Sequence, residues 1–242
     1  MHALLDAQGL TKSFGQVTAL HPLDLQVGAG EIVCLLGANG AGKTTTLNLF
    51  LGFLTPTGGT ALVDGIDVAK ATRSARRALA YIPEQVALYP SLSGLENLAF
   101  FDRMAGGRRR VVELVQLLER VGLDAASAGQ AAGTYSKGMR QKVGIAIALA
   151  KDARCLLLDE PLSGLDPMAA NAFCGLLAAL GQDGRAVLMA THDLFRAKEV
   201  GTRIGIMKQG RLVEQVSAAT VDARELERIY LDHMKMPREG AT

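Results

Sequence analysis

The chain has few of the features that mark metal-binding, secreted or membrane-spanning proteins. Its three cysteines, Cys34, Cys155 and Cys174, form no C-x-x-C pair, and its four histidines are scattered along the chain, which argues against a structural zinc site. No stretch approaches the roughly 18 consecutive apolar residues of a membrane span. The first residues also lack the cationic start of a signal peptide. We therefore expect a soluble, cytosolic protein with reduced cysteines.

The balance of charge is too even for a strongly basic, nucleic-acid-binding protein. The formal net charge is +2 over 242 residues, so we expect no nucleic acid among the partners. One dense cationic cluster, residues 108–110, follows two glycines, and we interpret it as a solvated turn before a helix. Apolar residues make up 49% of the chain, which is long enough for one large or two small domains with a sizeable core.

The strongest pattern in the chain is a strand, a glycine-rich loop and a helix in that order. Residues 32–36 are an uninterrupted apolar run, as expected of a strand buried on both faces of a parallel sheet. Gly37, Gly40 and Gly42 then allow the backbone to turn tightly and to approach a ligand closely. A helical pattern follows and should end near Gly52.

This arrangement suits the phosphates of a nucleotide, because backbone N–H groups at a helix N-terminus favour anions. The spacing is G-x-x-x-x-G-K-T. In this pattern Lys43 would reach the β- and γ-phosphates, and the hydroxyl of Thr44 would ligate Mg²⁺. A glycine-rich turn that matches by chance is the alternative, but the strand and helix around the loop favour a nucleoside triphosphate site. The predicted binding loop contains Gly37, Ala38, Asn39, Gly40, Ala41, Gly42, Lys43, Thr44 and Thr45.

Two further strands place polar side chains where ligands bind in parallel α/β sheets, beyond the carboxyl ends. Residues 155–158 form a second buried run, followed by Asp159 and Glu160. Asp159 can hold Mg²⁺ and Glu160 can orient or deprotonate an attacking water, although an acidic helix cap is the alternative. His192 follows a third strand, residues 186–190. A lone histidine is usually structural, but this one lies within plausible reach of the γ-phosphate.

Other segments surround this predicted core. Residues 1–30 have the pattern of β-structure, and Phe14, which we place in a loop, is either a core residue or an exposed aromatic suited to stacking on a base. Residues 86–150 have a helical pattern, and Ser136 is a good N-cap within it. A helical block inserted between the strands of a phosphate-binding sheet predicts a second subdomain.

The ordered set of motifs resembles the ATP-binding subunit of an ABC transporter over nearly the whole chain. Residues 134–141 resemble the family's signature motif, usually written LSGGQ, and they retain its serine as Ser136 and a glycine as Gly138. The motif departs from that form at Tyr135, Lys137 and Met139. In this family two cassettes close head-to-tail around two ATP molecules. The resemblance therefore implies that Ser136 and Gly138 contact the nucleotide bound by a second subunit, in what we expect to be a homodimer.

The same resemblance assigns roles to the other motifs. Residues 156–160 resemble the Walker B strand with its catalytic glutamate, and His192 the switch histidine. Asp166 ends a segment similar to the D-loop, which implies an ATP-binding role. Phe14 matches the adenine-stacking position, where tyrosine is more usual. The implied fold is an α/β P-loop NTPase (RecA-like) core with an N-terminal antiparallel β-subdomain and an inserted α-helical subdomain.

The resemblance also implies how the chain is divided and what it binds. We expect one domain, with the catalytic core and β-subdomain in residues 1–85 and 151–215, the helical subdomain in 86–150, and a short C-terminal helix and tail in 216–242. Residues 81–98 are similar to the Q-loop region that receives the coupling helix of a membrane permease. The implied location is the inner face of the cell membrane. The motifs and the short tail favour bacterial export-type systems.

The Q-loop position carries the clearest departure from the family. Aligned through residues 87–90, the family's glutamine falls on Glu84, with Gln85 one position later. Either Glu84 meets the Mg²⁺ shell, or the loop shifts so that Gln85 does. We favour Glu84, because a carboxylate is a hard ligand suited to Mg²⁺ and because Pro83 stiffens the chain where a shift would occur.

Two other classes of protein compete with a transporter ATPase. A non-transport ABC ATPase, as in DNA repair or ribosome-associated factors, predicts a coiled-coil insertion or a second cassette, and the sequence contains neither. A P-loop NTPase of another kind, such as a small-molecule kinase, gives no reason for the signature helix, for Glu160 directly after Asp159, or for His192.

Overall fold

The structure of the chain, a computed structural model, describes residues 3–235. Its centre is a six-stranded sheet in which neighbouring strands are parallel except for the β9–β10 pair. The strands from one edge to the other are β10 (Arg211–Ser217), β9 (Arg203–Lys208), β3 (Ile32–Leu36), β8 (Ala186–Thr191), β7 (Cys155–Asp159) and β6 (Leu79–Ile82). All five residues of β3 are buried, as the continuous apolar run predicts for a strand covered on both faces.

A second, antiparallel sheet is built mainly from the N-terminal residues. Its strands in spatial order are β2 (Val17–Gly28), β1 (Ala3–Phe14), β4 (Gly58–Val63) and β5 (Ile66–Asp67). Helix α1 (Lys43–Phe50) shares one core cluster with this sheet and with one face of the central sheet. The loop expected at Phe14 is wrong in one respect, because Phe14 ends β1 and pairs with Val17 across a tight turn.

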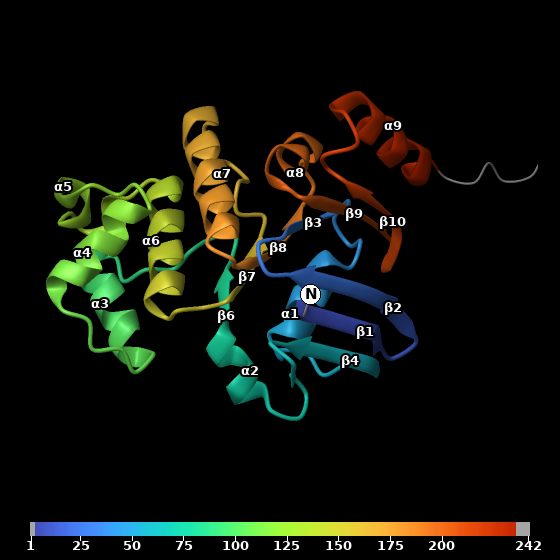
Figure 1. The fold of residues 1–242 in the computed structure, drawn as a ribbon, viewed down its shortest axis with the longest axis horizontal. Helices are drawn as coiled ribbons and strands as arrows, with labels where there is room; N and C mark the ends of the chain where they lie inside the picture. Colours follow the sequence, from blue (N-terminus) through green and yellow to red (C-terminus); the bar gives the residue numbers. More distant parts are fainter. Residues whose placement is uncertain (1–2, 236–242) are drawn as a thin grey trace, which may run out of the picture.

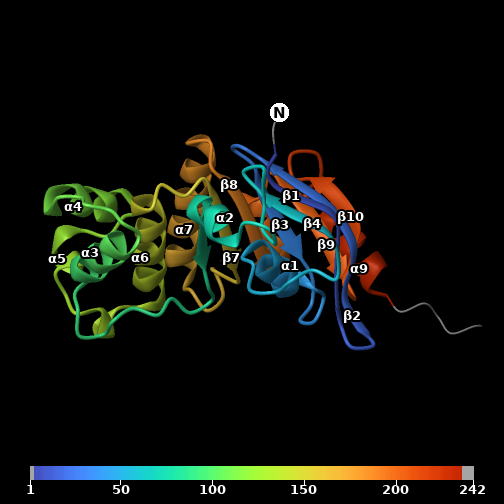
Figure 2. The same ribbon diagram turned by 90° about the horizontal axis from the view of Figure 1, so that it is seen from below.

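The remaining helices lie around the central sheet, and α3 to α6 form a helical layer at one end of the molecule (Figure 1). Figure 2 shows the same arrangement from below, with α3 to α6 at one end of the molecule and β1, β2 and β4 at the other. The described helices besides α1 are α2 (Thr72–Ala78), α3 (Gly94–Met104), α4 (Val111–Arg120), α5 (Ala125–Ala128), a 3₁₀ turn (Ala132–Thr134), α6 (Lys137–Ala150), α7 (Pro167–Gln182), α8 (Leu194–Val200) and α9 (Ala223–Met234).

The helical block packs as part of the main core. Leu98 of α3, Leu118 of α4 and Ile145 of α6 are fully buried in one cluster with Leu156 and Leu158 of β7. Burial of this kind removes apolar surface from water and supplies most of the driving force for folding. These helices therefore form an inserted α-helical layer on an α/β core, and the predicted fold class is confirmed.

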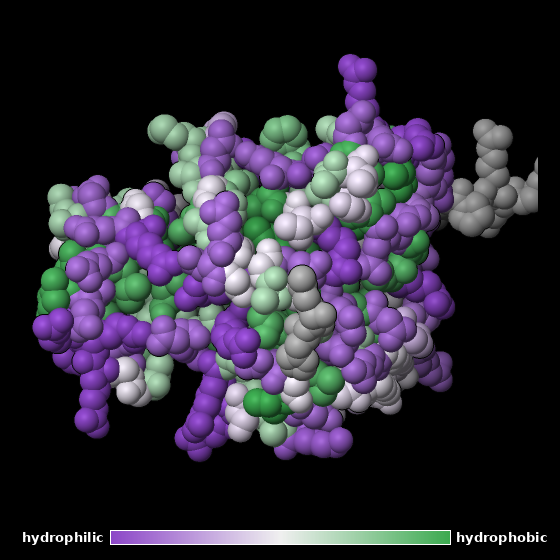
Figure 3. Space-filling model, in the orientation of Figure 1, coloured by the Kyte–Doolittle hydropathy of each residue, from purple (hydrophilic) through white to green (hydrophobic). Residues whose placement is uncertain are grey.

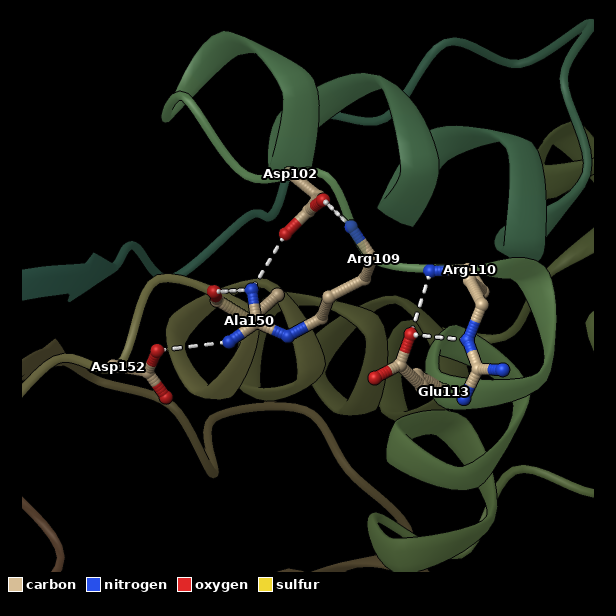
Figure 4. Close-up of polar contacts among 6 residues, drawn as sticks. All are labelled: Asp102, Arg109, Arg110, Glu113, Ala150 and Asp152. Carbon is tan, nitrogen blue, oxygen red and sulfur yellow. Dashed lines mark hydrogen bonds and ion pairs between the residues drawn. The ribbon is translucent and has the colours of Figure 1, made fainter.

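The solvated turn predicted for residues 108–110 is only partly correct. Arg110 is exposed and pairs with Glu113 at 3.2 Å, but the Arg109 side chain is only 24% exposed and joins three segments (Figure 4). Its guanidinium lies 2.7 Å from Oδ1 of Asp102 in α3 and 2.8 Å from Oδ2 of Asp152, and it donates to the carbonyl oxygen of Ala150. Since Asp102 is buried, the charge that neutralises it must come from a neighbouring side chain.

The three cysteines have the reduced form that the sequence predicts. Cys34, Cys155 and Cys174 are buried and free, and burial raises the pKa of Cys155 to about 12 and of Cys174 to about 11.

On the face shown in Figure 3, hydrophobic side chains are interrupted by hydrophilic ones. Within residues 3–235, no helix combines the length and the apolar composition that crossing a membrane requires. The last part of the predicted C-terminal tail, residues 236–242, lies outside the described residues.

Candidate nucleotide site

The carboxyl ends of β3 and β7 open onto a cleft of about 480 Å³. The strand β8 lies between β3 and β7, so the side chains that follow these three parallel strands come close together. The described residues that line the cleft are Ala19, Asn39, Gly40, Ala41, Gly42, Lys43, Thr44, Thr45, Glu84, Asp159 and Glu160.

The loop that leads into α1 has a backbone conformation that requires glycine at two positions. A Cβ atom on Gly37 would lie 2.4 Å from the carbonyl oxygen of Met207, and Gly42 has φ = 101° at the start of the helix. Gly37 N–H donates to the carbonyl oxygen of Thr191, at the end of β8. The loop is thereby held against two neighbouring segments, with the N-terminus of α1 directed into the cleft, as an anion site requires.

Lys43 is the principal cation inside the cleft. The residue is 5% exposed, and its ammonium donates to the carbonyl oxygens of Gly37 at 2.5 Å and Ala38 at 3.1 Å. Burial lowers the pKa of Lys43, while the carboxylates of Glu160 and Asp159 act in the opposite direction. The ammonium also lies 3.8 Å from Oε1 of Glu160. A charged group held this way can exchange carbonyl contacts for phosphate oxygens without moving far.

Three oxygen-bearing side chains line the cleft where a magnesium ion would be needed. The hydroxyl of Thr44 donates to Oδ1 of Asp159 at 3.4 Å, and Glu84 lines the same cleft. Burial is the main cause that raises the pKa of Asp159, and the Glu160 and Glu84 carboxylates add to it. Because a divalent cation would relieve this crowding of carboxylates, the donor set fits Mg²⁺, a hard ion that prefers oxygen ligands.

Glu160 is held in an unusual conformation. Its φ is 45°, in the left-handed region that non-glycine residues seldom adopt, and its N–H donates to the carbonyl oxygen of Ala190 in β8. Oε1 lies 2.9 Å from Nδ1 of His192, but the angles do not make a hydrogen bond. Among the described residues this buried oxygen has no hydrogen-bond partner. Strain and an unsatisfied buried oxygen are features that cluster at functional sites.

Six of the residues predicted for nucleotide binding do not line this cleft. Gly37 and Ala38 lie at the start of the loop, where their carbonyl oxygens accept from Lys43, and the other four lie elsewhere. Ser136 caps α6 by accepting from the N–H of Met139, and Asp166 caps α7 by accepting from the N–H of Ala169. Gly138 is buried in the first turn of α6. Phe14 is 49% exposed, with the ammonium of Lys12 4.9 Å from its ring centre. Within one chain these side chains are therefore not assembled with the P-loop.

Some contacts at the cleft were missed at the level of sequence. Ala19 of β2 lines the cleft, and Lys137 lies 3.5 Å from the Glu84 carboxylate. The only available signal was that Lys137 stands where the signature motif of the resembled family has glycine. Gln85 is not among the described residues that line the cleft, which supports the choice of Glu84.

A second cleft, of about 500 Å³, lies between α2 and the helical layer. Arg73 and Arg77, one helical turn apart on α2, are exposed at its edge, and Met104 is 69% exposed. The lining within the described part of the chain includes no acidic side chain. It consists of Arg73, Arg76, Arg77, Phe101, Met104, Ala105, Ile147 and Lys151. This second cleft, which we call the basic cleft, combines cations with an apolar floor.

Comparison with known proteins gives consistent matches along the chain. A family model described as "ABC transporter" matches residues 20–163. The bacitracin transport ATP-binding protein BcrA of Enterococcus faecalis is 33% identical over 226 residues, which are 93% of this chain and 72% of BcrA. The probable multidrug ABC transporter ATP-binding protein YbhF of Escherichia coli K12 is 35% identical over 212 residues, 87% of this chain. The chain spans only 36% of the length of YbhF.

A solved structure of an ATP-binding cassette is also similar to this chain. The dimeric post-hydrolysis state of the ATP-binding cassette MJ0796, bound to ADP and Pi, has a TM-score of 0.77 to this chain at 28% sequence identity. The alignment covers 88% of this chain and 98% of that cassette.

Proposed function

The chain belongs to the ABC transporter family, as one of its ATP-binding proteins, and from this premise we propose that it hydrolyses ATP to drive a separate membrane subunit. The observation that carries the proposal is the convergence of Lys43, Thr44, Asp159 and Glu160 in one cleft, from the N-terminus of α1 and the end of β7. The proposed division of the chain remains residues 1–85 and 151–215 for the core, 86–150 for the helical subdomain and 216–242 for the C-terminal part.

The residues of the cleft have separate roles in the proposed reaction. Lys43 and the N–H groups of the loop would bind the β- and γ-phosphates, and Thr44, Asp159 and Glu84 would hold Mg²⁺. The bound ion would neutralise phosphate charge and keep the terminal phosphates in one orientation. Glu160 accepts a proton from the water that attacks the γ-phosphorus, and the bond to the β–γ bridging oxygen breaks to give ADP and Pi. His192 orients the Glu160 carboxylate from the end of β8.

We propose that two copies complete each other's sites. Ser136 and Gly138 do not line the cleft of their own chain, and the N-terminus of α6 that they form has a favourable dipole for phosphate. The similar cassette MJ0796 has been solved as a dimer. In this arrangement Asp166 and Phe14 also act at the dimer's nucleotide sites, Phe14 by stacking on the adenine.

The membrane partner is proposed from the relatives and from the basic cleft. BcrA is named for bacitracin transport and YbhF as a probable multidrug transporter, so we place this chain in an export-type system at the inner face of the cell membrane. Tyr89, within the segment 81–98 that the resemblance connects with a permease, has its ring centre 6.3 Å from that of Phe101, which lines the basic cleft. The four cations and apolar floor of this cleft suit a permease segment that carries acidic and apolar side chains.

The experiment that tests this function uses the full chain with its co-purified membrane subunit. We expect magnesium-dependent release of Pi from ATP, and we expect the membrane subunit to increase the rate. Capture of a DNA-repair or ribosomal partner in place of a membrane protein would support the non-transport class instead. Absence of hydrolysis with the membrane subunit present would contradict the proposed activity.

A further inference from the structure

One face of helix α6 packs against the segment that contains Pro83, Glu84 and Val86. The side chain of Gln141, fully buried, donates to the carbonyl oxygens of Pro83 at 3.2 Å and Glu84 at 3.1 Å. One turn further along, a Cβ atom on Gly144 would lie 3.2 Å from the side chain of Val86, so the helix and the loop are in close contact. The backbone around Glu84 therefore follows the position of α6.

A charge pair extends this contact to the first turn of the helix. Lys137 precedes Gln141 by four residues and lies on the same face of α6. Its ammonium is 3.5 Å from Oε1 of Glu84, and the two side chains are 24% and 52% exposed. The same ammonium is 3.9 Å from the position that a Cβ atom would take on Gly164, in the loop after Glu160. Lys137 thus stands at the meeting point of three segments.

The Lys137–Glu84 pair lies between the nucleotide cleft of its own chain and the N-terminus of α6. Glu84 lines the nucleotide cleft with Asp159 and Glu160, where burial, together with the charges of Glu160 and Glu84, raises the pKa of Asp159. Lys137 directly follows Ser136, which caps α6 and does not line this cleft. One partner of the pair therefore faces the chain's own site, and the other belongs to the helix end that the proposed dimer directs at the opposite site.

We propose that Lys137 is a positioning residue that couples the two nucleotide sites of the dimer through its ion pair with Glu84. A cation that enters the cleft competes with Lys137 for the Glu84 carboxylate, because both are attracted to the same oxygen. Occupancy of one cleft then loosens the tie between Glu84 and the first turn of α6, and the Ser136 end becomes free to adjust to the other site. The pair is partly exposed and made by one ammonium and one carboxylate at 3.5 Å, so it is weak enough to be exchanged readily.

This inference rests on the proposed function, in which Ser136 serves the partner's site. Coupling between two binding sites must act equally in both directions. If one site changes the affinity of the other through Lys137, the second must change the first by the same factor. The measurable consequence is positive cooperativity in ATP-dependent dimerisation that depends on the Lys137 charge.

The test uses full-length protein carrying Glu160→Gln, so that bound ATP is not consumed. Dimer formation is measured by light scattering against Mg·ATP concentration, and affinity of the monomer is measured separately with a fluorescent ATP analogue. We expect Lys137→Met to weaken the coupling between sites by about two- to fivefold, the size of one partly exposed ion pair. Monomer affinity for Mg·ATP should rise by no more than the same factor, because the competitor for Glu84 is removed. Lys137→Arg should restore the coupling.

The matched control is Lys142→Met on the same helix, because the Lys142 ammonium donates to the Gly122 carbonyl and does not contact Glu84. Glu84→Gln combined with Lys137→Met should weaken coupling no more than Lys137→Met alone. Unchanged cooperativity in Lys137→Met, or an equal loss in Lys142→Met, would overturn the inference while leaving the proposed function intact. If the parent protein forms no ATP-dependent dimer, the proposed dimer fails and this inference fails with it.

Discussion

Nδ1 of His192 lies 2.9 Å from Oε1 of Glu160, so the residues after two neighbouring parallel strands meet above the nucleotide cleft. The contact does not have the geometry of a hydrogen bond, and Oε1 has no hydrogen-bond partner within the described residues, although the Lys43 ammonium lies 3.8 Å away. Catalytic hydrogen bonds often become well aligned only when the substrate is bound. In the proposed mechanism this oxygen accepts a proton from water, which gives Glu160 a different role from that of Lys43.

We predict that Lys43→Ala and Glu160→Gln fail at different steps. Lys43 compensates phosphate charge in the bound ground state, so its loss should weaken ATP binding. In the proposed mechanism Glu160 acts only on the attacking water, so Glu160→Gln should bind ATP normally and lose about 10²-fold or more in rate. Equilibrium binding and steady-state hydrolysis with the membrane subunit present measure the two effects. Full ATPase activity in Glu160→Gln would refute the assigned role.

The proposed dimer predicts a difference between two mixed dimers. When one subunit carries Lys43→Ala and the other Ser136→Arg, both lesions fall in the same composite site and one site stays intact. When a single subunit carries both lesions beside a wild-type partner, both sites are damaged. ATP-dependent dimerisation of differently tagged subunits distinguishes these cases. Equal behaviour of the two dimers would show that Ser136 serves only as a helix cap, a role worth about 1 kcal/mol.

We predict that Arg109→Met destabilises the protein by about 2 to 3 kcal/mol. The change leaves the Asp102 carboxylate, which is 2% exposed, without its counter-ion, and the cost should stay below the roughly 3 to 5 kcal/mol of a fully buried pair because Arg109 is partly exposed. Urea unfolding measures the free energy. The adjacent control Arg110→Met removes only an exposed pair with Glu113, so we expect less than about 0.5 kcal/mol. Similar losses for both variants would contradict the assigned difference.

The basic cleft predicts an electrostatic contribution to capture of the membrane subunit. Reversing two exposed charges with Arg73→Glu and Arg77→Glu should reduce co-purification of that subunit, and the difference from wild type should shrink at high salt. ATP binding to the free subunit should not change. The control pair Arg108→Glu and Arg110→Glu carries the same change in charge outside the cleft. Equal loss of capture in both pairs would show that only the net charge matters.

The parts of the site that could be predicted from the sequence are those fixed by short segments. The order of strand, loop and helix around Lys43 is local, and an apolar strand that ends at Asp159 must place its carboxylates at the ligand-binding edge of a parallel sheet. The fold class, which the family resemblance implied, is confirmed. The catalytic and binding roles remain proposals, since they concern molecules that a single chain does not contain.

Other features depend on contacts between distant segments, and local patterns carry no signal for them. Arg109 meets Ala150 and Asp152 across more than 40 residues of chain, so three consecutive arginines appeared equivalent in the sequence. Lys137 and Glu84 are likewise 53 positions apart by their residue numbers, and each was noted separately as a departure from the family. Their contact is visible only once α6 is packed on the loop.

Glu84 and Gln85 give the sharpest remaining prediction. Gln141 holds the carbonyl oxygens of Pro83 and Glu84, and Glu84 lines the nucleotide cleft, whereas Gln85 is not among the described residues that line it. A shift of one residue would break these two hydrogen bonds at a point where proline already restricts the backbone. We therefore expect the register in which Glu84 meets the Mg²⁺ shell.

Three variants test this register. Glu84→Gln should retain most ATPase activity, because an amide oxygen can still take part in the Mg²⁺ shell. Glu84→Ala should uncouple hydrolysis from the membrane subunit, and Gln85→Ala should have little effect. Hydrolysis measured with and without the membrane subunit gives the coupling for each variant. If Gln85→Ala abolishes coupled hydrolysis while Glu84→Ala is silent, the loop is shifted by one residue and Gln85, not Glu84, serves the magnesium site.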